Sequence, residues 1–399
     1  MPAKVRQDAE AMSAELAGLR HAIHREPEIG LDLPLTQRKV LAALGGLPLE
    51  VTSGRELTSV TAVLRGGQPG ATVLLRGDMD ALPVTERTGV PYSSQIDGAM
   101  HACGHDLHTT MLAGAARLLS ARQQEIAGNV IFMFQPGEEG FAGAEQMISE
   151  GVLDAAGDRP VAAFALHVAS AALPRGVCST RPGPMLAGAD VLEVTVHGHG
   201  GHASQPHRAA DPIPVACEIV MALQAMVTRR FDVFDPVVLT IGSFHAGTTD
   251  NVIPDEVKLL GSLRTFSPET RTRAMDNAVR VAEDIASAHG LTATAGFASG
   301  YPVTVNNAGE ASFAHRTVTE LLGSGRCLTQ QFPLTGSEDF SFVLEQVPGA
   351  FLMLGACQQG ADPATAAFNH SADAVFDDAV LGDGAALYAE LALRRLAAV

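Results

Sequence analysis

The stretch Ala71-Thr-Val-Leu-Leu-Arg-Gly-Asp78-Met-Asp80-Ala-Leu-Pro83 decides the fold. It is an apolar, β-rich run that ends in two carboxylates and a proline. Continuous apolar strands are typical of parallel sheets buried on both faces, and α/β proteins place their chemistry at the carboxyl ends of such strands. Asp78 and Asp80 would face the same side of a continuing strand. Either could ligate a metal or orient a ligating histidine, and a plain strand-end turn would also explain them.

Two later runs repeat this pattern. Residues 129–134 form an apolar run that is followed by Gln135-Pro-Gly-Glu138-Glu139-Gly140, and residues 161–168 form another that contains His167 near its end. Adjacent glutamates on a glycine-framed turn can serve one site, with one binding a metal while its neighbour takes a proton from water. Alone, each ending also fits an exposed acidic turn or a satisfied core histidine. Their repetition, with helical segments between them, predicts an α/β domain with a mostly parallel sheet and helices on both faces.

The densest polar cluster is His101-Ala-Cys103-Gly-His105-Asp106-Leu-His108, which directly precedes an apolar run that predicts a helix. Thiolate and imidazole groups one residue apart, on a turn that enters a helix, suit Zn, Mn, Co or Ni. The alternative is a polar loop in which Asp106 caps the helix amides.

A change of composition at Arg181-Pro-Gly-Pro184 predicts a domain boundary. The chain of 399 residues also exceeds the size at which single cores stop growing, which is roughly 250 to 300 residues. The pattern that follows the boundary is strand, helix, two strands and helix, which predicts a smaller α+β sandwich. We expect a catalytic domain, residues 1–183 and 299–399, into which this lid or dimerisation domain, residues 184–298, is inserted.

The expected insert carries a glycine-rich loop, His197-Gly-His199-Gly-Gly-His202-Ala-Ser-Gln-Pro206-His207. Its 198–203 segment imitates a dinucleotide-binding fingerprint, but the prolines that follow delay the helix that such a fingerprint requires. A loop that presents His202 to an oxyanion or a ligand fits better. Asn251 and Arg264 could bind a carboxylate, the arginine through a two-pronged contact, or could be a turn amide and a surface arginine.

Composition excludes several classes of partner. The net charge is −17, with 27 Lys and Arg against 44 Asp and Glu, so nucleic acid and anionic membranes are not expected partners.

Five scattered cysteines fit a reducing compartment. The amino terminus lacks the apolar core of a signal peptide, and the weakly polar run 161–173 is too short to span a bilayer. A cytoplasmic protein is therefore expected.

Taken in order, the motifs resemble the aminoacylase and carboxypeptidase family of di-metal hydrolases. The similarity is to the branch of hippurate hydrolase, N-acetyl-diaminopimelate deacetylase and the plant auxin-conjugate amidohydrolases, and it covers nearly the whole chain. The motifs that carry it are Gly77-Asp-Met-Asp80-Ala-Leu-Pro, His101-Ala-Cys-Gly-His-Asp106, Gly137-Glu-Glu139-Gly, His167, Gly200-Gly-His202-Ala-Ser, Asn251-Val-Ile-Pro254, Gly336-Ser-Glu-Asp-Phe340 and Asn369-His370-Ser371.

The resemblance implies two divalent metal ions per subunit, Mn, Zn, Co or Ni, and a role for each site residue. The implied ligands are Cys103, His105, Glu139, His167 and His370. It also implies Glu138 as general base, Asp80 as the orienting aspartate, His202 as the oxyanion-stabilising residue that acts across a dimer, and Asn251 and Arg264 as binders of the substrate carboxylate. One departure stands out: many members have a ligating histidine two residues before the aspartate, where this chain has Asp78. The role of Asp78 and the assignment of ligands to each metal stay open.

We therefore expect a homodimeric amidohydrolase that cleaves N-acyl amino acids of the hippurate or N-acetyl type with metal-activated water. The products would be a carboxylic acid and a free amino acid. A dipeptidase or carboxypeptidase that uses the same site is the alternative. A nicotinamide-dependent oxidoreductase built on residues 198–203, or a metal-storing protein, would represent other classes. A storage site has no use for an unligated base such as Glu138.

Overall fold

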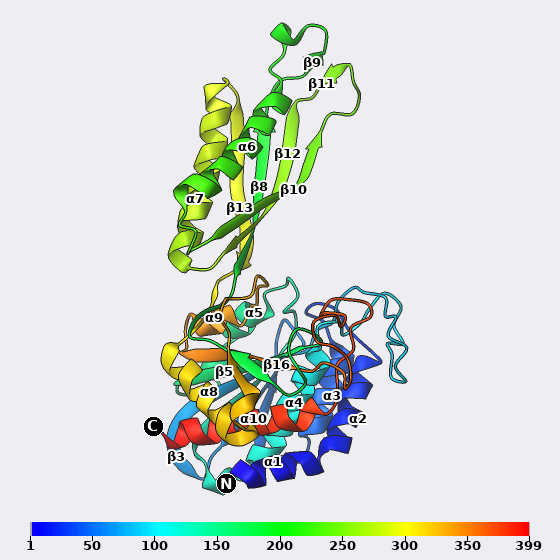
Figure 1. The fold of residues 1–399 in the computed structure, drawn as a ribbon, viewed down its shortest axis with the longest axis vertical. Coiled ribbons are helices and arrows are strands. Elements are labelled where there is room, and N and C mark those ends of the chain that lie inside the picture. Colours follow the sequence, from blue (N-terminus) through cyan, green and yellow to red (C-terminus); the bar gives the residue numbers. More distant parts are fainter. Residues whose placement is uncertain (1, 399) are drawn as a thin grey trace. The chain divides into compact units, whose positions relative to one another are not determined.

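The computed structural model describes residues 2–398, with the side chains of all of them except residues 2, 3 and 299. It divides into two compact units, which Figure 1 shows by colour along the chain. Unit 1 contains the residues up to 185, residues 305–332 and those from 342 onward, and unit 2 contains residues 186–304 and 333–341.

The limits of unit 2 differ from those expected for the insert, residues 184–298. The later end arises because residues 292–301 form a further strand of its sheet, which the sequence did not reveal. Residues 333–341 also belong to unit 2, where the Ala187 N–H donates to the carbonyl oxygens of Leu334 and Gly336.

Unit 1 is built on an eight-stranded sheet with helices packed against it. The helices are α1 (Pro2–Ala11), α2 (Ser13–His24), α3 (Pro34–Leu44), α4 (His105–Ser120), α5 (Gly143–Ser149), α8 (Ala308–Leu322) and α10 (Val380–Ala397), with single turns η1 (Gln123–Glu125), η2 (Val152–Asp154) and η4 (Ser324–Arg326). The strands are β1 (Leu49–Ser53), β2 (Val60–Arg65), β3 (Gln68–Asp78), β4 (Ala127–Gln135), β5 (Ala162–Ala169), β6 (Cys178–Thr180), β15 (Cys327–Thr329) and β16 (Gly349–Gly355). Where the chain passes between the units it forms β7 (Gly183–Leu186), β14 (Thr304–Asn306) and α9 (Ser341–Leu344).

The sheet of unit 1 is mostly parallel at its centre. Its strand order is β1-β2-β4-β3-β5-β16-β6-β15, and β3 pairs in parallel with both β4 and β5. The last seven residues of β3 are all buried, as expected for a central strand covered on both faces. The predicted mixed α/β fold with a large, mostly parallel sheet is confirmed.

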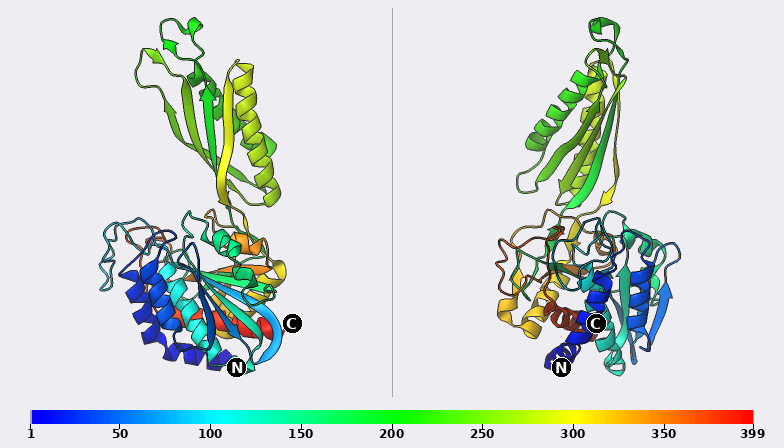
Figure 2. Two further views of the ribbon diagram at one scale, coloured as in Figure 1. Left: turned by 180° about the vertical axis from the view of Figure 1, so that it is seen from behind. Right: turned by 90° about the vertical axis from the view of Figure 1, so that its right-hand side faces the viewer.

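Helices α4 and α10 pack against each other and against β3, and Figure 2 shows them beside the sheet. A buried hydroxyl fixes this packing. The Tyr388 hydroxyl of α10 donates to the carbonyl oxygen of Arg76, at 2.5 Å, and accepts from the N–H of Leu166, at 2.8 Å. One side chain therefore braces β3 and β5 just before the ends that carry the candidate site.

Unit 2 has its own sheet and its own hydrophobic core. Its elements are β8 (Gly188–His197), β9 (Gly201–His202), η3 (Pro206–Arg208), α6 (Pro212–Arg230), β10 (Val237–Ala246), β11 (Val252–Ile253), β12 (Glu256–Thr265), α7 (Pro268–Ala288) and β13 (Thr292–Tyr301). The antiparallel sheet has the order β10-β12-β8-β13, and its strands alternate between buried and more exposed residues. The buried positions form one cluster with residues of α6 and α7, which makes a two-layer sandwich.

Helix α6 is the single helix within residues 2–398 whose length and composition would suffice to cross a membrane. Its buried residues recur every three or four positions, from Val215 through Ile219 and Leu223 to Met226. They belong to the core cluster of unit 2. This pattern is that of an amphipathic helix that covers a sheet.

Candidate metal centre

Five predicted ligands converge beyond the carboxyl ends of the central strands of unit 1. The Cys103 Sγ atom lies 3.4 Å from Nε2 of His167 and 3.3 Å from Nε2 of His370. Nε2 of His370 lies 3.2 Å from Oε1 of Glu139, and Nε2 of His105 lies 3.9 Å from the same oxygen. These side chains come from four separate stretches of the chain, yet they meet around one sulfur atom.

The donor atoms fall into two groups that share Cys103. One group contains Cys103, His105 and His167, and the other contains Cys103, Glu139 and His370, with all donor atoms of each group within 4.8 Å of one another. A thiolate can contribute to both groups, while the imidazoles and the carboxylate complete them. Zn, Mn, Co and Ni accept such mixed sulfur, nitrogen and oxygen donors.

The turn that separates Cys103 from His105 depends on Gly104. Its φ angle is +87°, in the left-handed region, and a Cβ atom there would meet Cγ2 of Val168 at 2.4 Å. Any side chain would therefore both strain the backbone and clash with β5. Gly104 allows His105 to begin α4 while Cys103 still faces the other ligands.

His370 and His105 both hold their protons more strongly than ordinary histidines, as expected of ligands that exchange protons for metal ions. Hydrogen bonds to Cys103 and Glu139 raise the pKa of His370 to about 10. Burial opposes the charged form of His105, but Asp78 and Cys103 outweigh it and hold the pKa of His105 well above its usual value. Metal binding to such a site would release these protons.

His167 already has the tautomer that a metal needs. Its Nδ1–H donates to the carbonyl oxygen of Val168, at 2.9 Å, so the Nε2 lone pair faces Cys103. Burial, together with the nearby His108, keeps the pKa of His167 well below its usual value. Neutral imidazole is the ligating form.

The surroundings of His105 also bear on whether these residues suit a metal ion. Both of its ring nitrogens are buried, and neither makes a hydrogen bond of good geometry within residues 2–398. Buried polar atoms normally have partners, and a metal ion is a partner that would suit a ring nitrogen of His105. The residues present therefore fit divalent metal ions.

Asp80 holds the turn that carries the two glutamates. Its Oδ1 accepts from the N–H of Glu138 and its Oδ2 from the N–H of Glu139, both at 3.0 Å. Oδ1 also lies 3.4 Å from Nδ1 of His105. Asp80 thus orients the acidic turn and faces a candidate ligand. The Glu138 carboxylate is buried and has a donor atom within 4.8 Å of those of His105 and Glu139.

Asp78, whose role the sequence left open, lies in a buried network of charged and polar groups. Its Oδ2 accepts from Nη1 of Arg76 and its Oδ1 from Nδ1–H of His108, both at 2.6 Å. Nε2 of His108 accepts the N–H of Val168, at 2.7 Å, so that nitrogen is also engaged. Although Asp78, His105 and His108 lie close enough to hold an ion, these contacts indicate that Asp78 and His108 support the strand ends instead.

Arg76 and His108 were missed as site residues, and each had a signal in the sequence. Arg76 is a charged residue inside an apolar strand, which requires a buried partner. His108 follows His105 by three residues on a helix, so both project from neighbouring positions of one side. Their shared partner, Asp78, is apparent only once the strand and the helix are packed together.

The three predicted residues of unit 2 do not gather in one place. His202 on β9 pairs with Val252 of β11, and the Ala203 N–H donates to the carbonyl oxygen of Asn251, so His202 and Asn251 are neighbours. The Gly200 N–H next to them donates to Asp255, which precedes β12. Arg264 lies near the far end of β12, where its Nη1 donates to Oγ of Ser337 at 3.2 Å.

The separation along β12 is large. At about 3.3 Å per residue, the stretch from Glu256 to Arg264 extends roughly 26 Å. His202 and Asn251 are exposed, and Arg264 is half-buried. Within one chain, the predicted carboxylate binders Asn251 and Arg264 are therefore too far apart to contact the same small carboxylate.

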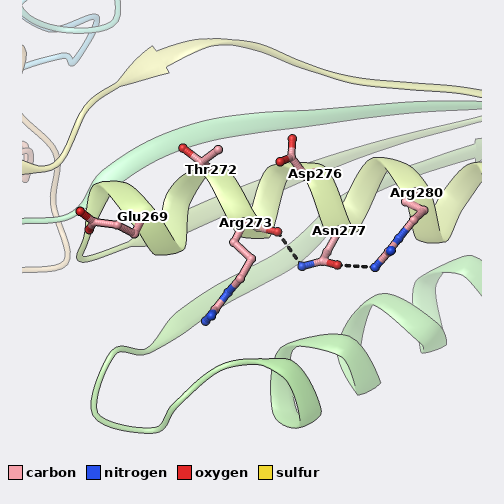
Figure 3. A pocket seen from close by; sticks show the side chains of 6 residues that line it. All are labelled: Glu269, Thr272, Arg273, Asp276, Asn277 and Arg280. Carbon is pink, nitrogen blue, oxygen red and sulfur yellow. Dashed lines mark hydrogen bonds between the residues drawn. The ribbon is translucent and has the colours of Figure 1, made fainter.

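Elsewhere on unit 2, a shallow hollow runs along the surface of α7 (Figure 3). Nδ2 of Asn277 donates to the carbonyl oxygen of Arg273, and Nη2 of Arg280 donates to Oδ1 of Asn277. None of the predicted site residues lines it. The lining residues are Glu269, Thr272, Arg273, Asp276, Asn277 and Arg280.

Comparisons with known proteins agree with this geometry. The profile of Peptidase family M20/M25/M40 matches residues 74–394. The chain is 36% identical to thermostable carboxypeptidase 2 of Saccharolobus solfataricus over 395 residues, which are 98% of each protein. It is 35% identical to hippurate hydrolase of Campylobacter jejuni over 388 residues, which are 96% of this chain and 97% of the relative.

A solved structure extends the likeness to the whole fold. It is that of a dinuclear metal-binding peptidase of the M20 family from Bacillus subtilis, with a TM-score of 0.83 and 31% sequence identity. The match covers 98% of this chain and all of that one. The chain therefore belongs to Peptidase family M20/M25/M40 and is a metal-dependent hydrolase of amide bonds.

Proposed function

We propose that this enzyme hydrolyses the amide bond of N-acyl amino acids, of the hippurate or N-acetyl type, to a carboxylic acid and a free amino acid. The observation that carries the proposal is the position of Glu138, a buried carboxylate beside two groups of ligands that share Cys103. Hippurate hydrolase is among the relatives, and a carboxypeptidase is another. The alternative is accordingly a dipeptidase or carboxypeptidase that uses the same residues.

Two divalent ions, Mn, Zn, Co or Ni, would be held by Cys103, His105, Glu139, His167 and His370. When bound, they would supply Lewis acidity for the amide carbonyl and lower the pKa of water. Glu138 would take a proton from the attacking water and pass it to the nitrogen of the leaving amine. Asp80 fixes the backbone on which this base sits, through the N–H groups of Glu138 and Glu139. A preorganised base needs no rearrangement at the moment of reaction.

Substrate recognition would depend on the residues of unit 2. Arg264 would hold the substrate carboxylate through its guanidinium, a group suited to two parallel hydrogen bonds. His202 would stabilise the negative charge that develops on the carbonyl oxygen, and Asn251, its neighbour, would contact the substrate.

The distances within unit 2 favour a homodimer. Because His202 and Asn251 lie beyond the start of β12, and Arg264 follows Glu256 by roughly 26 Å of strand, one small substrate could not contact both ends of one subunit. We infer that a substrate held by Arg264 of one subunit would meet His202 of the partner subunit. The inserted unit would then act both as lid and as dimerisation domain, in a cytoplasmic enzyme whose cysteines are all free within residues 2–398.

A substrate panel tests the activity. Purified protein loaded in turn with Mn, Zn, Co or Ni is given N-acetyl and N-benzoyl amino acids and, separately, dipeptides. Faster hydrolysis of the acylated amino acids is expected. A preference for dipeptides by a factor of ten or more in kcat/KM would favour the peptidase alternative, and no turnover of either class would contradict both.

Mixed dimers test the sharing of residues. Chains that carry Glu138→Gln and chains that carry His202→Ala are each inactive or nearly so, and are mixed under conditions that exchange subunits. If His202 acts across the dimer, each mixed dimer regains one intact site, and activity rises toward a quarter of that of the wild type. No gain on mixing would show that His202 acts within its own chain or not at all.

A further inference from the structure

Asn369 lies between three stretches that carry candidate ligands. It follows β16 and directly precedes His370. Its Nδ2 donates to the carbonyl oxygens of Cys103, at 3.1 Å, and Val168, at 2.9 Å. Its Oδ1 accepts from the N–H of Ser170, at 3.0 Å, and from the Ser170 hydroxyl, at 3.1 Å. The amide can face only this way, because carbonyl oxygens cannot donate and a backbone N–H cannot accept.

These contacts restrain all three stretches at once. They hold the carbonyl of Cys103, the end of β5 directly after His167, and the loop of His370. The backbone of His370 has a φ angle of +71°, which is uncommon for a residue other than glycine. Such a conformation persists only where neighbouring contacts fix it. The Asn369 side chain and the bond from the His370 N–H to the carbonyl of Ala102, at 2.8 Å, provide those contacts.

The same amide group also faces the shared sulfur. Nδ2 of Asn369 lies 3.8 Å from Sγ of Cys103, close enough for one of the two N–H groups that donate to the carbonyl oxygens of Cys103 and Val168 to be shared with the sulfur. A hydrogen bond to a thiolate withdraws electron density from the sulfur, and such outer contacts tune metal sites. Because Sγ belongs to both ligand groups, one N–H would influence both ions together.

We propose that Asn369 is a positioning residue that fixes the Cys103 thiolate and moderates its donation to the two metal ions. The inference rests on the proposed metal centre. It assigns to Asn369 an effect on the sulfur itself, beyond bracing the loop of His370. Loss of the amide N–H would leave a more electron-rich sulfur that is also less well placed.

Cobalt is the probe for this effect, because sulfur bound to Co(II) gives a charge-transfer band in the near ultraviolet. Metal-free wild type, Asn369→Asp and Asn369→Ala are titrated with Co(II) while the spectrum is recorded. Asn369→Asp keeps the shape and the acceptor oxygen for Ser170 but removes both N–H bonds. We expect this band to move to longer wavelength and Co(II) affinity to fall about 10- to 100-fold in both variants.

Ser170→Ala is the matched control. It removes the hydroxyl that bonds Asn369 Oδ1 and the carbonyl of Ala367 but leaves the amide against the sulfur. The band of Ser170→Ala should coincide with that of the wild type. If Asn369 had a merely structural role, the bands of the Asn369 variants would coincide with that of the wild type as well. Circular dichroism shows which variants are folded. If only one of the two Asn369 variants folds, its band and its Co(II) affinity are sufficient to decide the outcome.

The outcomes separate this inference from the proposed function. An unshifted band and unchanged affinity in a folded Asn369 variant would overturn the inference alone. A wild type without a sulfur-to-cobalt band would overturn the metal centre and the inference with it. A normal cobalt band without hydrolysis of N-acyl amino acids would contradict only the proposed substrate class.

Discussion

The metal centre of unit 1 and the three candidate residues of unit 2 are built in opposite ways. Around Cys103 and His105, most side chains are buried, several are oriented by hydrogen bonds to neighbouring groups, and the strand ends fix the backbone. His202 and Asn251 are exposed, and Arg264 has one described side-chain hydrogen bond, to Ser337. The five candidate ligands therefore lie within one folded unit, whereas the roles proposed for His202, Asn251 and Arg264 depend on what these more exposed residues contact.

The largest expected effect tests whether unit 1 contains the general base as well as the metal ligands. Glu138→Gln should lower kcat roughly 10²- to 10⁴-fold, because the amide cannot take the proton from water. The bound ions should remain, since the five ligands are unchanged. Steady-state kinetics on an N-acyl amino acid, with metal content by elemental analysis, measure both. Undiminished hydrolysis by this variant would remove Glu138 from the reaction.

The next prediction concerns the sulfur that both ligand groups share. Cys103→Ser should lower metal content from two ions toward none and abolish activity, because a hydroxyl is a poor substitute for a thiolate. His167→Ala and His370→Ala, which each affect one group, should lose about one ion. Elemental analysis after dialysis gives the ratios. Equal losses in all three variants would contradict the shared role of Cys103.

A substitution in unit 2 should weaken substrate binding without changing the metal content. Arg264→Ala should raise KM for an N-acyl amino acid about tenfold or more, since it loses a charged partner of the carboxylate. Arg229→Ala, a change of an exposed arginine at the end of α6, is the control. If Arg264→Ala also released the ions, the separation between the two regions would fail.

The last prediction concerns stability and not catalysis, and it involves a buried charged cluster around Asp106, in the first turn of α4. His24 bonds Asp106 and Glu86, and although burial opposes its charged form, Asp106 raises the pKa of His24 to about 9. Its stabilising contribution is therefore complete below the unfolded pKa of about 6.5 and is lost as pH rises to about 9, a change of up to roughly 3 kcal/mol. Urea unfolding of wild type and His24→Gln at several pH values between 6 and 10 measures this slope.

In that experiment the difference in unfolding free energy between the two proteins should shrink as pH rises. His289→Gln provides the control, because His289 is an exposed residue paired with Glu218 on unit 2. A constant difference for His24→Gln across this range would indicate that the His24 charge does not contribute to stability.

Much of unit 1 could be predicted from the sequence because its strands are buried on both faces. Residues 71–83, 129–134 and 161–168 are nearly continuous apolar runs, so their polar ends were conspicuous. β13 was missed because its residues, Thr292-Ala-Thr-Ala-Gly-Phe-Ala, are small and carry little hydrophobic pattern. The boundary of the insert was consequently set too early.

Contacts between distant segments were beyond prediction. The amide of Asn369 reaches Cys103 across 266 positions, and the partners of Asp78 lie on both its own strand and α4. The separation of His202 from Arg264 was likewise hidden, since both lie on the same insert. The antiparallel pairing of β12 with β8 places the loop that carries His202 next to the start of β12, whereas Arg264 lies near the end of that strand.

The separate core of unit 2 has a consequence for how such enzymes diversify. Seventeen buried apolar residues, from Leu192 to Ala286, pack among themselves, and none of the candidate ligands belongs to this group. Changes on the outer face of that sheet can therefore accumulate without altering the chemistry-bearing atoms. Under the proposed function, a lineage could therefore change its preferred substrate by modifying this module while it inherits the metal ligands of unit 1 intact.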